Sequence, residues 1–371
     1  MNRKIMFVIP SLTGGGAEKT LVTLLKNLNR EVYTPLLVLF QKIITYEDDM
    51  PDDINIVNFD KKSRYDNFRL IRDLARAIKK ETPSIICSFI SYTNFITLIA
   101  CQLLRTKVPV VLSVHNNATE EFRDNKYPWL RKLLTRYLYP KADLIHCVSQ
   151  GLKADLVNNF SIESEKIKVI YNPIDTEKIA AMALEEVRHP WFQEDVPVLL
   201  ACGRLATQKN YPLLLRALRQ VNQNTKARLL ILGEGEQRNF LENYAKELGL
   251  FDKVEFLGFR SNPFQYMARA TAFVLSSSHE GFGRVIVEAM ACGLPVISTR
   301  CPDGPDEIIA NGQNGFLVPV NMENPLARAI LEVLRNEPLR RKFIEEGKKR
   351  AEDFSLTRII PQFEEMFAKF C

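Results

Sequence analysis

The sequence predicts an α/β protein built from two doubly wound, Rossmann-like domains. Short apolar runs that suit buried strands alternate with amphipathic helical patterns through both halves of the 371 residues. Such alternation is typical of parallel sheets whose strands are joined by crossover helices. The length suits about two domains, and 46% hydrophobic with 25% charged residues is an ordinary globular composition.

The elements of the first half follow one another in a regular order. Strands are expected at residues 5–10, 34–40, 54–59, 85–89, 108–114 and 144–148. Helical periodicity falls between them at residues 18–29, 69–81, 93–105 and 129–139. Turn-forming residues at 169–175 close this half, so we expect a first domain over residues 1–173.

The same order begins again in the second half. Strands are expected at residues 198–202, 227–232, 254–257, 272–275, 295–298 and 315–318. Helices are expected at residues 210–222, 238–248, 263–269 and 285–292. This pattern predicts a second domain over residues 174–354, and residues 355–371 read as an amphipathic helix that returns to the first domain. Open sheets of this kind bind ligands at the carboxyl ends of their strands, so we expect the two domains to face each other across a cleft.

Charge and composition narrow the classes of function. The net charge of +6 lies in the first half, where residues 1–172 hold 25 Lys and Arg against 18 Asp and Glu. A basic half suits nucleic acid, an anionic membrane or a phosphorylated substrate. Nucleic acid is the weakest of these, because the basic residues do not alternate with aromatic residues on a strand. No apolar run is long enough to span a bilayer, no signal peptide is evident, and the seven cysteines are widely spaced, so we expect a cytoplasmic protein with reduced thiols.

Two carboxylates bracket a glycine-containing loop in the second half. Glu280 precedes Gly281, Phe282 and Gly283, and Glu288 lies just over one turn inside the helix that follows. A strand, a glycine loop and a helix in this order direct backbone N–H groups toward one point, where a phosphate can be held. The two glutamates would then accept hydroxyl groups of a sugar nucleotide, although spacing alone equally allows two solvated surface glutamates.

Two further loops follow strands. Gly15 and Gly16 come shortly after the first strand and open a helix, which suits either close approach to a phosphate or an ordinary tight turn. Arg204 and Lys209 follow the strand at 198–202, where they could contact the two phosphates of a diphosphate or remain solvated. The glycine pattern matches neither a dinucleotide fingerprint nor a P-loop.

His115 ends the strand at 108–114 and is either a ligand-facing residue or an ordinary core or surface histidine. None of the four histidines has a spacing that suits a metal, and no Asp-x-Asp pair is present. We therefore expect neither a metal ion nor a cofactor. Charge on a leaving diphosphate would be neutralised by Arg204, Lys209 and backbone donors.

Taken together, these motifs resemble the retaining glycosyltransferases of family four with the GT-B fold. The resemblance rests on GGGAE, GRLATQK, the Leu-Gly-Glu-Gly turn with FLGF after it, and EGFGRVIVEAMACGLPVI, and it covers nearly the whole chain. It implies transfer of a hexose or N-acetylhexosamine from a nucleoside diphosphate sugar, UDP-linked, to a glycan acceptor bound by the first domain.

The resemblance also implies roles for single residues. Gly15 and Gly16 approach the donor diphosphate, which Arg204 and Lys209 bind. The loop at 281–283 contributes to the same donor site. Glu288 holds the ribose, Glu280 and His115 contact the donor hexose, and Arg260 lies beside the base. We expect Glu280, His115, Arg204 and Lys209 to act in catalysis.

Two positions depart from the family pattern. Asn210 follows the motif lysine where glycine is frequent, and Arg284 replaces an apolar or small polar residue at the start of the helix. Arg284 could add an anion contact or point into solvent. Two other functions remain open: a nucleotide-sugar epimerase on the same fold, and a binding protein without activity.

The helix expected at 129–139 carries an apolar stripe of Leu and Tyr residues and, on its opposite side, a basic stripe. The apolar stripe consists of Leu130, Leu133, Leu134, Tyr137 and Leu138, and the opposite stripe of Arg131, Lys132, Thr135 and Arg136. The pattern suits a core helix with a basic outer face. With Trp129 nearby and the positive excess in this half, it also suits docking to the anionic inner face of the cytoplasmic membrane, where a lipid-linked acceptor would be presented.

Overall fold

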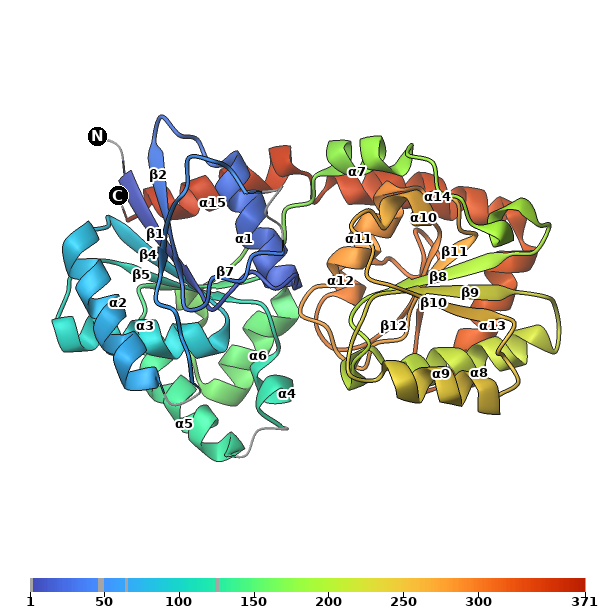
Figure 1. Cartoon of the computed structure of the whole chain (residues 1–371), viewed down its shortest axis with the longest axis horizontal. Coiled ribbons are helices and arrows are strands. Elements are labelled where there is room, and N and C mark those ends of the chain that lie inside the picture. Colours follow the sequence, from blue (N-terminus) through green and yellow to red (C-terminus); the bar gives the residue numbers. More distant parts are fainter. Residues whose placement is uncertain (1–2, 46–49, 64–65, 124–126, 371) are drawn as a thin grey trace. The chain divides into compact units, whose positions relative to one another are not determined.

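The computed structural model describes residues 3–45, 50–63, 66–123 and 127–370. The chain forms two compact units, one of Met1–Pro173 with Leu356–Cys371 and the other of Ile174–Ser355. Each unit contains one parallel sheet with helices on both faces (Figure 1). No helix of the described ranges is both long and apolar enough to cross a bilayer.

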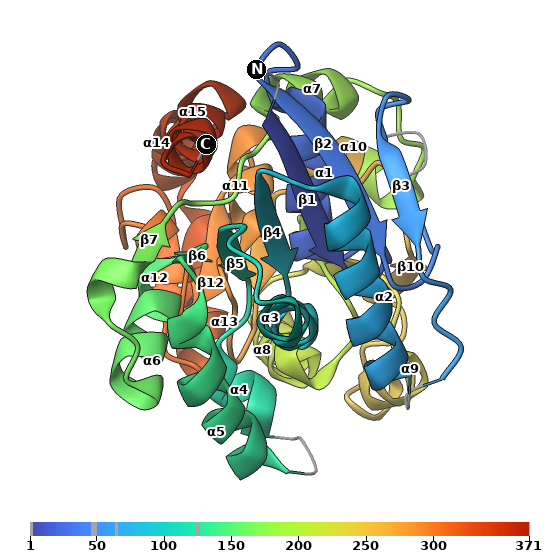
Figure 2. The same ribbon diagram turned by 90° about the vertical axis from the view of Figure 1, so that its left-hand side faces the viewer.

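The first unit has a seven-stranded sheet in the order β3-β2-β1-β4-β5-β6-β7. Its strands are β1 Arg3–Ile9, β2 Tyr33–Leu39, β3 Asn55–Asn58, β4 Ile85–Phe89, β5 Val110–Val114, β6 Leu144–Cys147 and β7 Ile167–Val169. Its helices are α1 Gly16–Asn27, α2 Asn67–Glu81, α3 Ser91–Leu104, α4 Ala118–Arg123, α5 Pro128–Leu138, α6 Gln150–Phe160 and α15 Leu356–Ala368, with 3-10 turns η2 Tyr139–Lys141 and η3 Ser164–Lys166. The helices α2, α3, α5 and α6 pack side by side in sequence, whereas α1 contacts α15 (Figure 2).

The second unit has a six-stranded sheet in the order β10-β9-β8-β11-β12-β13. Its strands are β8 Val198–Cys202, β9 Arg228–Leu232, β10 Val254–Gly258, β11 Ala272–Leu275, β12 Val296–Thr299 and β13 Phe316–Val318. Its helices are α7 Thr176–Ala183, α8 Tyr211–Asn222, α9 Arg238–Glu247, α10 Phe264–Met267, α11 Arg284–Ala291, α12 Pro305–Ile308, α13 Glu323–Arg335 and α14 Glu337–Glu352, with 3-10 turns η4 Pro190–Gln193 and η5 Thr207–Lys209. The neighbours α8 and α13 share one apolar core with the sheet, and α11 packs against α14.

The C-terminal helix α15 belongs to the first unit, as the sequence predicts. Its apolar residues Phe363, Met366 and Phe367 are fully buried in the core that β1, β2 and α1 share. The ring of Phe367 meets that of Phe7 on β1 edge to face, at 6.0 Å between centroids. In addition, the Glu364 carboxylate accepts a hydrogen bond from the backbone N–H of Asn29 at 2.9 Å. Burial of this apolar stripe fixes the helix on the sheet.

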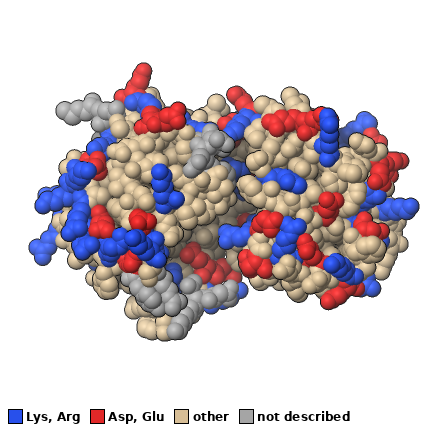
Figure 3. Space-filling view, in the orientation of Figure 1, with Lys and Arg blue, Asp and Glu red and all other residues tan. Residues whose placement is uncertain are grey.

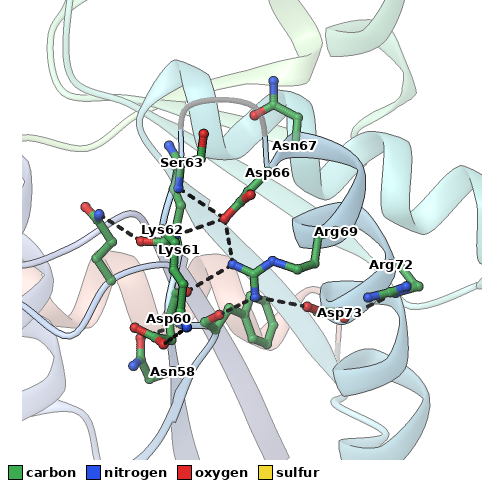
Figure 4. A network of polar contacts seen from close by, with 12 residues as sticks. Asn58, Asp60, Lys61, Lys62, Ser63, Asp66, Asn67, Arg69, Arg72 and Asp73 are labelled. Atoms are coloured by element: carbon green, nitrogen blue, oxygen red, sulfur yellow. Dashed lines mark hydrogen bonds and ion pairs between the residues drawn. The ribbon is translucent and has the colours of Figure 1, made fainter.

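An ion-pair network fixes the start of α2 (Figure 4). The Arg69 guanidinium donates to the carbonyl oxygens of Phe59 and Asp60 and pairs with Asp66 at 2.8 Å and Asp73 at 3.7 Å. The hydrogen bond from Arg69 lowers the pKa of Asp66 to about 2. Positive and negative side chains therefore neutralise each other on this helix. Over the whole face drawn in Figure 3, Lys and Arg are interspersed with Asp and Glu.

The orientation of α5 differs from the stripes expected from the sequence. Thr135, which we placed on the polar stripe, is fully buried and Leu138 is buried beside it. Leu130, Leu133 and Tyr137 of the expected apolar stripe are instead exposed. Helix α5 packs against α3, α4 and α6, and its buried residues are Thr135 of the expected polar stripe and Leu138 of the expected apolar stripe. The prediction of a core helix with only a basic outer face is therefore wrong.

Candidate active site

The two central strands of the second unit mark the position of its site. All strand pairs in this sheet are parallel, so their carboxyl ends lie at one edge. Strands β8, β9 and β10 follow one another in one direction, whereas β11, β12 and β13 follow in the other. The order therefore reverses between β8 and β11, and such a switch point is where open α/β sheets bind their ligands.

The loops after β8 and β11 are joined by hydrogen bonds. The backbone N–H of Ser278 donates to the carbonyl oxygen of Gln208 at 2.8 Å, and the Gln208 side-chain amide donates to the carbonyl oxygen of His279 at 2.8 Å. These bonds hold the two loops at a fixed separation. Lys209 on one loop and Glu280 on the other are thereby brought into direct contact.

Lys209 and Glu280 form a nearly buried ion pair. The Lys209 ammonium lies 2.5 Å from Oε1 of Glu280, and the side chains are only 17% and 9% exposed. The Ser277 hydroxyl donates to the same oxygen at 2.6 Å. The sequence patterns placed these two residues on different parts of a ligand and did not foresee that they contact each other. Ser277 was missed altogether, because its role depends on the loop that folds it onto Glu280.

The basic residues expected at the site are not all gathered at this pair. Arg204 directly follows Gly203 at the end of β8, and its side chain is exposed. It forms no ion pair with any carboxylate among the residues that the structure describes. Arg260 is also exposed and follows β10, an edge strand two places from β8. Since the Lys209 charge is compensated by Glu280, Arg204 is the cation left to meet an anion at the end of β8.

The loop before α11 requires glycine. Gly283 is the N-cap residue of α11, with a φ of +91° that side chains rarely adopt. Gly304 lies against Phe282, the residue before Gly283. A Cβ atom on Gly304 would stand 2.1 Å from the carbonyl oxygen of Phe282. Phe282 itself is buried against Phe354, at 5.3 Å between ring centroids. The loop at 281–283 is thus anchored by Phe282, and the start of α11 is fixed by the two glycines.

Glu288 lies on α11 and is buried, with 6% of the residue exposed. The Arg284 guanidinium, one turn earlier, lies 3.7 Å from its Oε1 atom, and the Arg284 side chain is only 11% exposed. Of the two orientations considered for Arg284, the one that points into solvent is therefore wrong. The two charges compensate each other inside the unit, as a buried pair must.

In the first unit, α1 begins at the expected glycines. Gly15 is the N-cap residue and Gly16 is the first helical residue, and Gly14 before them has a φ of +103°. Thr20 on the next turn donates to Oδ1 of Asn172 at 2.8 Å. The start of α1 is therefore tied to the segment after β7, at the carboxyl edge of the first sheet.

His115 directly follows β5 and is buried, at 8% exposure. Its Nε2 atom lies 2.8 Å from the hydroxyl of Ser113, and that hydroxyl lies 2.8 Å from Nδ1 of His146 on β6. The ring of Phe89 stacks on His115 at 5.3 Å between centroids. The sequence patterns did not connect Ser113 or His146 with His115, although Ser113 shares its strand face.

The acidic, histidine and cysteine side chains of the described ranges form no group of three or more that could hold a metal ion. The arrangement in the second unit can hold an anion beside Arg204 and hydroxyl groups beside Glu280 and Glu288.

Comparison with known proteins places the chain in a family. The family model described as Glycosyltransferase Family 4 matches residues 14–178, and the one described as Glycosyl transferases group 1 matches residues 185–350. A Campylobacter jejuni protein named N-acetylgalactosamine-N,N'-diacetylbacillosaminyl-diphospho-undecaprenol 4-alpha-N-acetylgalactosaminyltransferase is 33% identical, over 96% of this chain and 97% of its own. A second enzyme of that organism, a GalNAc-alpha-(1->4)-GalNAc-alpha-(1->3)-diNAcBac-PP-undecaprenol alpha-1,4-N-acetyl-D-galactosaminyltransferase, is 26% identical over 99% of this chain and 98% of its own.

Solved structures share the fold over the whole length. An Anabaena protein crystallised in complex with UDP superposes with a TM-score of 0.84 at 24% identity, covering 99% of this chain and 100% of its own. Sucrose-phosphate synthase from Thermosynechococcus elongatus gives 0.84 at 19% identity, with 99% of each chain covered. The expected fold class, GT-B with two Rossmann-like domains, is confirmed. The chain therefore belongs to the family 4, group 1 glycosyltransferases, and it is a glycosyltransferase.

Proposed function

We propose that the protein transfers a hexose or N-acetylhexosamine from a UDP-sugar to a lipid-linked glycan, with retention of anomeric configuration and without a metal ion. The reaction belongs to the assembly of bacterial surface glycans and takes place at the inner face of the cytoplasmic membrane. The observation that carries the proposal is the Lys209–Glu280 pair beside Arg204, at the carboxyl ends of the two central strands of the second unit.

The second unit is proposed to hold the donor. Arg204 binds the diphosphate, because it is a forked cation that no described carboxylate neutralises. Lys209 holds Glu280 through Oε1, and the other carboxylate oxygen accepts a hydroxyl of the hexose. Glu288 accepts the ribose hydroxyls, and Arg260 lies beside the base. The Gly281–Gly283 backbone and the start of α11 add N–H donors.

The first unit is proposed to supply Gly15 and Gly16 to the donor diphosphate and His115 to the hexose. As the diphosphate leaves, negative charge grows on its oxygens, and fixed donors stabilise that charge without reorganising. Glu280 is held by Lys209 and Ser277, so it is not placed as a nucleophile. Attack by the acceptor on the face that the diphosphate leaves is therefore the proposed route to retention.

The proposed acceptor rests on the relatives. Both Campylobacter jejuni enzymes are named for acceptors linked to diphospho-undecaprenol or PP-undecaprenol. Such an acceptor is anchored in a bilayer, so the enzyme must work close to a membrane surface. The relatives also favour an N-acetylhexosamine as the transferred sugar, because both are named N-acetylgalactosaminyltransferases.

Helix α5 is proposed as the membrane-docking surface. Trp129, Leu133 and Tyr137 are 66%, 57% and 63% exposed, which is unusual for large apolar side chains on one short helix. Lys132 and Arg136 are exposed on the same helix. Aromatic and apolar side chains rimmed by cations suit the interface of an anionic bilayer.

A transfer assay tests the proposal. The full-length protein is incubated with radiolabelled UDP-N-acetylgalactosamine, UDP-N-acetylglucosamine, UDP-galactose or UDP-glucose and a polyprenyl-diphosphate-linked saccharide. We expect label in the lipid extract with one donor, and an α-linkage by NMR when the donor is α-linked. Label found only in an isomerised nucleotide sugar would instead assign an epimerase. Arg204→Ala is expected to lose transfer while retaining the fold.

A further inference from the structure

A chain of buried polar groups runs behind His115. It connects His115 to Ser113 on β5, Ser113 to His146 on β6, and His146 Nε2 to the carbonyl oxygen of Ile170, each at 2.8 Å. Ser113 and His146 are register partners in the parallel pair β5 and β6, so their side chains lie on one face of the sheet. All four residues are buried.

The positions of the protons in this series of hydrogen bonds follow from the last acceptor, the carbonyl oxygen of Ile170. The carbonyl oxygen of Ile170 can only accept, so His146 must carry its proton on Nε2. Burial lowers the pKa of His146 to about 4, so its ring is neutral and Nδ1 is an acceptor. The Ser113 hydroxyl therefore donates to His146 and accepts from Nε2–H of His115.

The opposite direction would be costly. If Ser113 donated to His115, then His146 would have to donate from Nδ1 and from Nε2 at once. It would be an imidazolium ion in a site that is closed to solvent and covered by Phe363 of α15, at 4.9 Å between ring centroids. An uncompensated buried cation is strongly unfavourable.

We propose that Ser113 and His146 are positioning residues that hold Nε2–H of His115 on the Ser113 hydroxyl, so that Nε2 carries the proton and the ring keeps one orientation. Phe89 stacks on the ring and fixes its plane. The inference rests on the proposed function only in its consequence: the ring of His115 would meet the donor sugar in one fixed orientation.

The tautomer can be measured without turnover. Long-range 1H–15N correlation spectra of the full-length protein at pH 7.5, assigned with His115→Gln and His146→Phe variants, report which ring nitrogen carries each proton. We expect Nε2–H at both His115 and His146. In Ser113→Ala, His115 should become a mixture of tautomers, and transfer should fall by about tenfold or more. Ser113→Thr, which retains a hydroxyl on the strand, should show the wild-type tautomer of His115 and the wild-type transfer rate.

Ser88→Ala provides the matched control. Ser88 is a buried serine on the adjacent strand β4, and its hydroxyl bonds only to the Thr97 hydroxyl, at 3.1 Å, among the contacts of the described residues. This variant should keep the wild-type tautomer and rate. An Nδ1–H tautomer of His115 in the wild type, or a tautomer unchanged by Ser113→Ala, would overturn the inference. If the spectra are as expected but the protein transfers no sugar, the inference about His115 is supported and only the proposed function is rejected.

Discussion

The ammonium nitrogen of Lys209 lies 2.5 Å from Oε1 of Glu280, at the carboxyl ends of strands β8 and β11. This pair joins two loops that are 71 residues apart in sequence. Each charge is nearly buried, so each depends on the other for compensation. Lys209 therefore has a structural role in addition to any contact with a ligand.

We predict that Lys209→Met lowers the free energy of unfolding of the second unit. Loss of one partner from a buried pair leaves an uncompensated charge and typically costs about 3 kcal/mol or more. Neutralising the carboxylate as well, in Lys209→Met/Glu280→Gln, should recover most of that loss. Urea unfolding of the two variants and of Glu280→Gln measures the coupling. Arg204→Ala should leave stability unchanged, since Arg204 is exposed. Equal stability losses in Lys209→Met and the double variant would contradict the structural role.

The sequence predicts positions along the chain better than contacts across it. Strand β8 lies where its apolar run predicts it, and α11 begins where the preceding glycines predict it, because both signals are local. Strand β7, Ile167–Val169, was not among the expected strands, because three residues are too few to show a period. Helices α6, α13 and α14 were not among the expected elements.

In the candidate site, too, contacts between sequence neighbours can be predicted, whereas contacts between distant segments cannot. Burial of Glu288 and the approach of Arg284 follow from one helix turn, which sequence spacing can suggest. The contact of Lys209 with Glu280 depends on two strands meeting in the sheet, and that of Ser113 with His146 depends on register. Spacing along the sequence predicts neither of these two contacts. On α5, the period placed Thr135 on the polar stripe, but tertiary packing buries Thr135 and leaves Leu133 and Tyr137 exposed.

Arg284 should affect nucleotide binding through Glu288. Its guanidinium lies 3.7 Å from the carboxylate and holds it in place inside the unit. We predict that Arg284→Gln weakens UDP binding by about tenfold, equivalent to about 1.4 kcal/mol. Isothermal titration calorimetry with UDP provides the dissociation constant. Arg300→Gln, at an exposed position after β12, serves as the control. An unchanged dissociation constant in Arg284→Gln would remove Arg284 from the donor site.

Transfer should be insensitive to chelators. The proposed neutralisation of the leaving diphosphate relies on Arg204 and backbone N–H groups, which EDTA does not remove. We predict that the rate in EDTA equals the rate with added magnesium or manganese. Initial rates in the transfer assay, with protein first dialysed against EDTA, provide the comparison. Activity that disappears in EDTA and returns with a divalent ion would show that a metal is required.

Acidification should destabilise the first unit through His146. Burial lowers its pKa from 6.5 to about 4, so between these values the unfolded chain binds a proton that the folded chain does not. The contribution to stability is present above pH 6.5 and is lost as the pH falls to 4, with a limit of about 3 kcal/mol. We predict that His146→Phe flattens the pH dependence of unfolding in this window. Cys147→Ala, on the same strand, should retain it, and an unchanged slope in His146→Phe would exclude His146 as its source.

The exposed surface of α5 should bind anionic vesicles. Each cation near such a surface contributes about 1 kcal/mol, and the apolar side chains add burial at the interface. We predict that wild-type protein floats with vesicles that contain phosphatidylglycerol and that Trp129→Ser/Leu133→Ser does not. Lys132→Gln/Arg136→Gln should bind more weakly, and its residual binding should depend less on salt. Arg131 is left unchanged, because its guanidinium packs over the ring of Phe122 at 5.7 Å.

The control for flotation replaces equally exposed apolar residues elsewhere in the first unit. Phe68 on α2 and Leu103 on α3 are 88% and 71% exposed, so Phe68→Ser/Leu103→Ser removes comparable apolar surface on helices other than α5. This variant should float like the wild type, and all variants should bind UDP equally. If the control loses flotation while the α5 variants keep it, the membrane contact lies elsewhere on the first unit. Absence of flotation in the wild type would favour an acceptor that is not presented by a bilayer.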